Sequence, residues 1–321
     1  MGFHCRSSIN TLFLGISEDE ALFARRGFAP AAPQKQQQLE NIGQTFIAGY
    51  RLALCGAALD ELRGNLDQVE PEYRGFAFEG AGMALALTDA LWRQDRFAAF
   101  LHGPGAAHCY MLHVGYGWAA GRLPWMRWDL ARTLRGLDPL LGSLMIDGYG
   151  FHEGYFHWRS AIAEANIPGR VRGYFARQFD QGLGRALWFF NGADPGRTVE
   201  CLHSFPHHRH DDLWSGVGLA AAYAGAATEG ELEWLRDAAG DSAGRLAQGA
   251  AFAATARHRA GNVVAHTAVA TGVFCGRSVT EAAAITDAAL EAVCAMPEPY
   301  ERWRAEIRRR MRSATAQRQS A

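Results

Sequence analysis

Apolar residues recur three to four positions apart along this chain far more often than they alternate with polar ones. Ala and Leu are abundant, whereas Val and Ile are sparse. Ala and Leu favour helices, and an apolar period near 3.6 residues indicates a helix with one buried face. The pattern therefore predicts an all-α protein.

The first long helix is expected over residues 39–63. Its apolar positions lie three or four residues apart and share one face; they are Ile42, Phe46, Tyr50, Ala53 and Ala57. Residues 30–38, rich in Pro and Gln, are typical of a polar linker. We expect an N-terminal segment with its linker over 1–38, a helical repeat domain over 39–297, and an Arg-rich C-terminal helix and tail over 298–321. That last helix is expected to be a solvated cap or an interaction arm.

A short Gly-x-Gly or Gly-x-Ala motif recurs at a regular interval. Its copies begin at Gly80, Gly115, Gly148, Gly182, Gly216 and Gly249, which are 35, 33, 34, 34 and 33 residues apart. A period near 34 residues is typical of helix-pair repeats, and small residues let a neighbouring backbone approach closely. The spacing predicts a solenoid or curved helical bundle of such pairs. The alternative is an irregular Ala/Gly-rich helical domain.

Composition narrows the class of protein. The 321 residues carry a formal net charge of −1, so no overall basic surface for nucleic acid is expected. No run of about 18 apolar residues is present, and no membrane span is expected. The six cysteines are widely spread without a CxxC motif. They are typical of reduced, buried thiols, so we expect a cytoplasmic protein.

One glycine motif departs from the others. Four residues after its first glycine, Gly148, stands His152, where the other Gly-x-Gly copies have Ala. On a helix, Glu153 and His157 share one face, and Asp147 and His152 lie within two turns of them. These four residues are candidate catalytic acid–base groups. Alternatively, the histidines are hydrogen-bonding residues between helices.

A metal site is a second possibility for the same region. Glu79 directly precedes the first glycine motif and, with His152, Glu153 and His157, would make a carboxylate and histidine set that suits non-haem iron or another transition metal. Alternatively, Glu79 is a carboxylate at a helix start, favoured by the helix dipole. The His-rich residues 203–210 are typical of a solvated loop, with a metal site as the alternative.

Longer stretches of the chain resemble the domain-of-unknown-function family 1702. They are residues 23–28, 75–84, 147–156, 180–188, 212–225 and 246–253. Members of that family are often encoded in enediyne antibiotic gene clusters beside the polyketide synthase. The resemblance therefore implies a role in making an enediyne or a related polyketide. It supplies no established set of catalytic residues.

The resemblance leaves two classes of function open. As an enzyme, the protein would act on a long, apolar, polyunsaturated intermediate in an aromatic-lined groove between helices. As a non-catalytic scaffold, it would hold a synthase, a carrier domain or a labile polyene product. Its partner is accordingly expected to be an apolar polyene or another biosynthetic protein.

Overall fold

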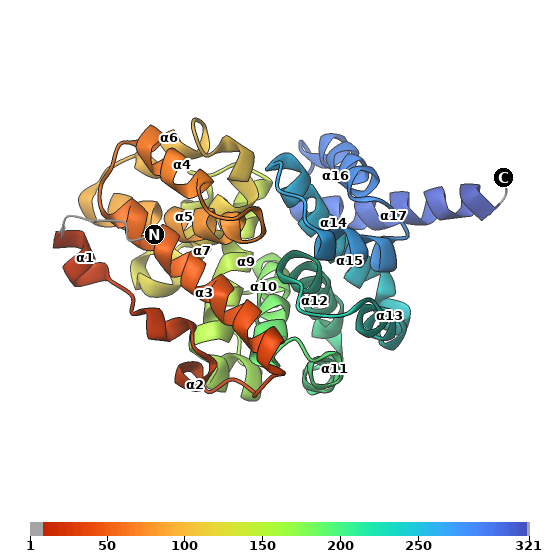
Figure 1. Ribbon diagram of the computed structural model, residues 1–321. Helices are drawn as coiled ribbons and strands as arrows, with labels where there is room; N and C mark the ends of the chain where they lie inside the picture. The colour runs from red at the N-terminus through yellow and green to blue at the C-terminus, as the bar shows by residue number, and fades with distance from the viewer. Residues whose placement is uncertain (1–8, 320–321) are drawn as a thin grey trace.

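The computed structural model describes residues 9–319 and is helical throughout, with no strand in that range. The all-α prediction is confirmed (Figure 1). The helices are α1 (Ile9–Leu14), α2 (Phe23–Arg26), α3 (Pro33–Leu54), α4 (Leu59–Asp67), α5 (Pro71–Trp92), α6 (Arg96–Leu101), α7 (Cys109–Arg122), α8 (Leu130–Leu134), α9 (Leu144–Phe156), α10 (Tyr174–Phe190), α11 (Pro195–His203), α12 (His210–Ala224), α13 (Glu229–Ala238), α14 (Ala243–Arg259), α15 (Ala265–Cys275), α16 (Val279–Val293) and α17 (Pro299–Gln319).

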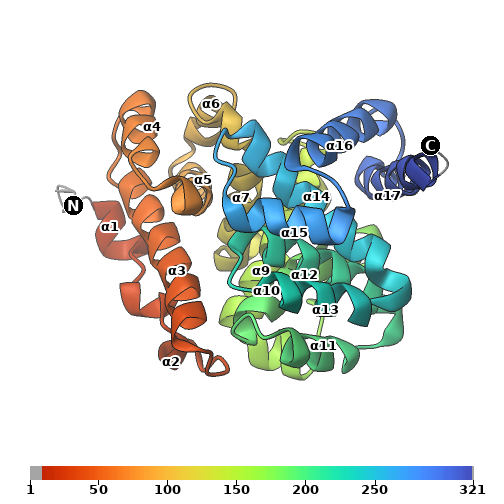
Figure 2. The same cartoon turned by 45° about the vertical axis from the view of Figure 1, so that its right-hand side comes forward.

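Eight of these helices form one row in chain order. Helix α3 packs on α5, α5 on α7, and so on through α9, α10, α12, α14 and α16 (Figure 2). Inner members of the row are buried over most of their length because other helices cover them on several sides. Helix α5, for example, is buried at every position from Gly75 to Thr88.

The repeated glycines set the spacing of this row. A Cβ on Gly115 of α7 would lie closer than 3.0 Å to the carbonyl oxygen of Glu79 on α5, and one on Gly117 would meet that of Met145 on α9 just as closely. Two residues along a helix are about 200° apart. The two glycines of one Gly-x-Gly copy therefore lie on opposite sides of their helix. Each packs on a different neighbouring helix.

The shorter helices α11, α13 and α15 form an outer layer beside the second half of the row, where α13 packs on both α11 and α15. Their starts follow the sequence. Thr228 caps α13 and Ser278 caps α16, each in a reciprocal pair of hydrogen bonds with the Glu three residues later.

The row bends back on itself, so that its first helices reach its later ones. Arg257 of α14 donates from Nη2 to the carbonyl oxygen of Glu72 on α5 at 3.0 Å and to that of Tyr223 on α12 at 2.6 Å. Phe76 of α5 stacks edge-on against Tyr223 at 5.1 Å. Helices α5, α12 and α14 therefore meet across the interior of the row.

Three sequence-based boundaries differ in the structure. The helix expected over 39–63 is two helices, because the chain turns at Gly56, whose φ of 78° is left-handed. Helix α3 begins at Pro33 and so includes most of the predicted linker, since Pro is well suited to a first helical turn. Helix α17 is no purely solvated cap: Tyr300, Trp303 and Ile307 are fully buried.

The cysteines and the apolar helices complete the comparison. Cys109, Cys201, Cys275 and Cys294 are free thiols, but Cys294 is exposed, so the expectation of buried thiols is wrong at that residue. Within residues 9–319, none of the helices combines the length and hydropathy that crossing a membrane requires.

Candidate functional site

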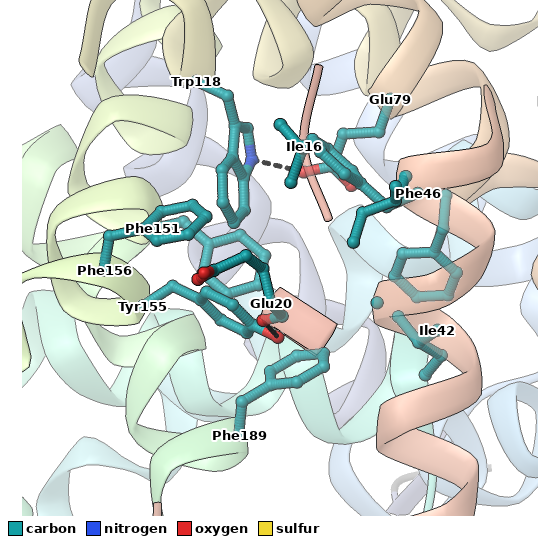
Figure 3. Close-up of a pocket in the computed structure, with 13 residues that line it drawn as sticks. Ile16, Glu20, Ile42, Phe46, Glu79, Trp118, Phe151, Tyr155, Phe156 and Phe189 are labelled. Carbon is teal, nitrogen blue, oxygen red and sulfur yellow. Dashed lines mark hydrogen bonds between the residues drawn. The ribbon is translucent and has the colours of Figure 1, made fainter. Parts of the chain in front are cut away.

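An aromatic pocket lies between the first helices of the row (Figure 3). Its cavity volume is about 40 Å³, so side chains of the wall must move aside before it can hold a molecule much larger than water. Helices of the row and the segment before α2 supply its walls. The lining side chains are Ile16, Glu20, Ile42, Phe46, Ile47, Phe76, Glu79, Trp118, Phe151, Tyr155, Phe156 and Phe189, together with Gly43.

Glu79 is the carboxyl group buried in this wall. It is 1% exposed. Its Oε1 accepts a hydrogen bond from the indole N–H of Trp118 at 2.8 Å (Figure 3) and lies 3.8 Å from Arg185 Nη2. Its Oε2 has no hydrogen-bond partner among the described residues. A carboxyl with one free oxygen in an apolar pocket can exchange a proton with a bound molecule.

Burial sets the proton affinity of Glu79. Loss of solvation raises its pKa to about 7, against the opposing effects of the Arg185 charge and the Trp118 hydrogen bond. Near neutral pH the group therefore exists in both protonation states. That property suits a general acid or base.

Asp147 lies behind the pocket and holds Arg185 in place. Its Oδ1 accepts from Arg185 Nη1 at 2.6 Å, and its Oδ2 accepts from Gln181 Nε2 at 2.7 Å. Both charged residues are buried, and the guanidinium lies 4.5 Å from the ring centre of Phe151. Asp147 is thus a partner of Arg185 and does not lie on the pocket surface.

The buried polar residues continue as a chain across the row. Ser215 Oγ lies 3.1 Å from both Gln181 Oε1 and Gln248 Oε1 and donates its one proton to either of them, and Arg304 of α17 donates from Nε to Gln248 Oε1 at 3.1 Å. Each of these hydrogen bonds joins neighbouring layers of the interior. Hydrogen bonding of this kind offsets the cost of burying the polar groups.

A second group of titratable residues lies at the end of α9. The ligand atoms of His152, Glu153 and His157 all lie within 4.8 Å of one another. Each histidine Nδ1 is 3.1 Å from a different oxygen of the Glu153 carboxylate. His152 is buried, whereas the His157 side chain is 55% exposed. The i,i+4 pairing of Glu153 and His157 that the sequence predicted is therefore present.

The electrostatics of this group follow from its hydrogen bonds. Burial raises the pKa of Glu153, but the hydrogen bonds and charges of the two histidines outweigh burial and lower it to about 2. Burial lowers the pKa of His152, while the Glu153 hydrogen bond raises that of His157. Glu153 is therefore a carboxylate anion near neutral pH.

The two groups lie in adjoining hollows. An open depression of about 560 Å³ is lined by His152 and His157 and shares Ile16, Glu20 and Phe156 with the aromatic pocket. Trp118 links the groups, because its N–H bonds Glu79 while its ring contacts His152 edge-on, 5.7 Å between centres. Glu79 itself stays with Arg185 and is not among the three close ligand atoms.

The His-rich residues 203–210 show no comparable cluster among the described residues. His210 bonds the carbonyl oxygen of Phe205 through Nε2 at 2.7 Å. Arg209 is buried, and its Nε lies 2.9 Å from Oδ2 and 3.1 Å from Oδ1 of Asp180. This segment therefore has a structural role at the start of α12.

Comparison with known proteins adds the family. The model of the family "Protein of unknown function (DUF1702)" matches residues 6–311. The chain belongs to this family. The match spans both hollows and the whole row of helices, so the candidate site lies inside the family domain. Among curated proteins and among solved structures, none matches the chain.

Sequence reasoning missed Trp118, Arg185 and the polar chain within this family domain. A signal for the chain was present. The residue just before the first glycine of a motif is polar in five of six copies: Glu79, Asp147, Gln181, Ser215 and Gln248. Since each following glycine packs on the preceding helix of the row, these positions face the interior together.

Proposed function

We propose that this protein binds an apolar, unsaturated small molecule in the aromatic pocket and uses Glu79 for proton transfer to it. The observation that carries the proposal is a buried carboxyl with a free Oε2 and a pKa of about 7 in a wall of aromatic side chains. Aromatic rings pack well on flat, unsaturated molecules. The cavity of about 40 Å³ widens on ligand entry in this proposal, because its walls are side chains with few polar groups.

Each neighbour of Glu79 has a part in the proposed reaction. Protonated Glu79 donates a proton from Oε2 to one carbon of the bound molecule and then removes a proton from another carbon, which regenerates the acid and shifts a double bond. Arg185 stabilises the carboxylate that forms between the two steps. Trp118 fixes the orientation of the carboxyl group through its hydrogen bond.

The family resemblance suggests the setting of this reaction. We propose a role in the biosynthesis of an enediyne or a related polyketide, with a long polyunsaturated intermediate as the ligand. The aromatic lining supports such a ligand. In the same proposal, the glycine-spaced row is a helix-pair repeat of about 34 residues that curves to enclose the pocket. Its regular layers support that interpretation.

Ligand binding can be tested with cis-parinaric acid, a fluorescent conjugated tetraene. We expect saturable binding by the wild-type protein and an affinity roughly tenfold lower for Phe156→Ala. Phe175→Ala is the matched control, because Phe175 is also a half-buried aromatic residue but does not line the pocket. Equal affinity in wild type and Phe156→Ala, or no binding at all, would reject the pocket as the ligand site.

The role of Glu79 needs a separate variant. Glu79→Gln keeps the shape of the side chain but cannot release a proton. We expect this variant to bind cis-parinaric acid and to abolish product formation in a producing strain. Glu72→Gln, on the same helix and partly exposed, is expected to leave the product unchanged. Normal product yield from Glu79→Gln would leave the non-catalytic holding function in place of the enzyme.

A further inference from the structure

We propose that His152, Glu153 and His157 form a transition-metal site beside the aromatic pocket. This inference goes beyond the proposed proton transfer and does not depend on it. Two histidines and one carboxylate with open coordination positions are a donor set used by non-haem Fe(II) and suited to Zn²⁺. The three ligand atoms already lie within 4.8 Å of one another.

The end of α9 brings the three side chains together. Glu153 is in the last turn of the helix, and His157 is its C-terminal cap, with a φ of −122° that has left the helical conformation. Its imidazole therefore turns back toward the Glu153 carboxylate. His152 approaches the other carboxylate oxygen from the buried side.

Space for the His152 ring is provided by the neighbouring helix. A Cβ on Gly121 of α7 would lie closer than 3.0 Å to the His152 Cγ, Nδ1 and Cε1 atoms. Any side chain at Gly121 would therefore push the imidazole out of its position. The carbonyl oxygen of Gly121 accepts from Arg127 Nη1 at 2.8 Å, which fixes the backbone against the ring.

His152 and His157 line the depression of about 560 Å³, whereas Glu153 lines a neighbouring hollow on the other side of the group. A metal ion there would have free coordination positions toward solvent. Arg122 and Arg127 line the same depression, and Arg127 lies 3.9 Å from Glu153 Oε1. These cations oppose a bare metal ion but favour an anionic group of a bound molecule beside it.

Metal binding can be measured directly with Co²⁺, whose visible absorption reports coordination by nitrogen ligands. We expect one ion per chain in the wild-type protein, displaced by Zn²⁺. His157→Ala and Glu153→Gln are each expected to weaken Co²⁺ binding at least roughly tenfold. His157 is half exposed, so its loss leaves the core intact, and circular dichroism verifies the fold of each variant.

The controls separate this site from adventitious binding elsewhere. His207→Ala and His208→Ala, in the exposed part of the His-rich segment, are expected to leave the affinity unchanged. Gly121→Ala is expected to weaken binding without removing a ligand. The proposal is overturned if Co²⁺ does not bind, or if binding survives His157→Ala and Glu153→Gln but is lost in the His207 or His208 variant. Parinaric acid binding is measured separately, so this result is distinguishable from failure of the proposed function.

Discussion

Gly117 of α7 packs directly on the backbone of α9, where a Cβ would lie closer than 3.0 Å to the carbonyl oxygen of Met145. Backbone atoms cannot move aside cheaply, so an added methyl group must separate the two helices. The same relation recurs on both sides of most helices in the row.

The first prediction follows from that contact. Gly117→Ala is expected to lower the free energy of unfolding by about 3 kcal/mol or more, because overpacking separates the helices. Gly272→Ala is the matched control. Gly272 lies within α15, and a methyl group there would have open space around it, so Ala is expected to stabilise by about 0.5 to 1 kcal/mol. Urea unfolding measures both changes, and a tolerated Gly117→Ala would contradict the close approach.

A second prediction concerns the charges around Glu79. Arg185→Met is expected to raise the pKa of Glu79 above about 7, because the guanidinium that favours its carboxylate is lost. Asp147→Asn is expected to lower the same pKa, because the Asp147 charge disfavours the Glu79 carboxylate. Trp118 fluorescence against pH is the measurement, with Glu79→Gln as the variant that removes the titration. Shifts of the same sign in both variants would be inconsistent with these assignments.

The third prediction uses a histidine outside the candidate site. His108 is buried and stacked on Phe78 at 3.7 Å, and burial lowers its pKa to about 3. The unfolded chain then takes up a proton near pH 6.5, whereas the folded protein does not. Stability from this residue is therefore complete above pH 6.5 and is lost progressively as the pH falls toward 3.

Replacement of that histidine should flatten the acid side of the stability curve. Between pH 7 and pH 4, wild-type protein is expected to lose roughly 2 to 3 kcal/mol more than His108→Phe. Unfolding by urea at several pH values gives the comparison. His102→Gln replaces an exposed histidine six residues before His108, and this variant should follow the wild-type curve. Parallel curves for wild type and His108→Phe would show that His108 is protonated in the folded protein.

The fourth prediction is a stabilising substitution. Arg308 is half-buried, and its Nη1 has no hydrogen-bond partner among the described residues. Burial, together with the charges of Arg245 and Arg304, lowers its pKa to about 9. Arg308→Met keeps the packing and removes the repulsion, so it should raise the free energy of unfolding by about 1 to 2 kcal/mol. Arg312→Met, at an exposed residue of α17, should change it little, and destabilisation by Arg308→Met would disprove the idea of repulsion.

The local part of this structure could be predicted from the sequence. Helix content follows from composition and apolar period, and the contact of Glu153 with His157 follows from their spacing on one helix. The 34-residue glycine spacing located the helices of the row, but the two glycines of each Gly-x-Gly copy pack on opposite neighbours. The presence of two glycines so near each other in the sequence did not show that they contact different helices.

The long-range part could not be predicted in the same way. Glu79 meets Arg185 because α5 and α10 face a common interior once the row bends back. No local pattern encodes that curvature, which depends on contacts such as Arg257 with the backbone of α5. The sequence does not single out Trp118, since only the fold shows that its N–H points at the buried carboxyl.

Lys35, the single lysine of the chain, lies where α3 meets the outer layer. Its Nζ donates to Glu231 of α13 at 2.6 Å and to the carbonyl oxygen of Ala193 at 3.0 Å. An amine-selective reagent thus has one side chain to modify, and that amine is occupied only while α3 is docked on α13. The rate of acylation of Lys35 Nζ therefore reports how often the contact between Lys35 and Glu231 opens. Mass spectrometry can measure this rate without any engineered label.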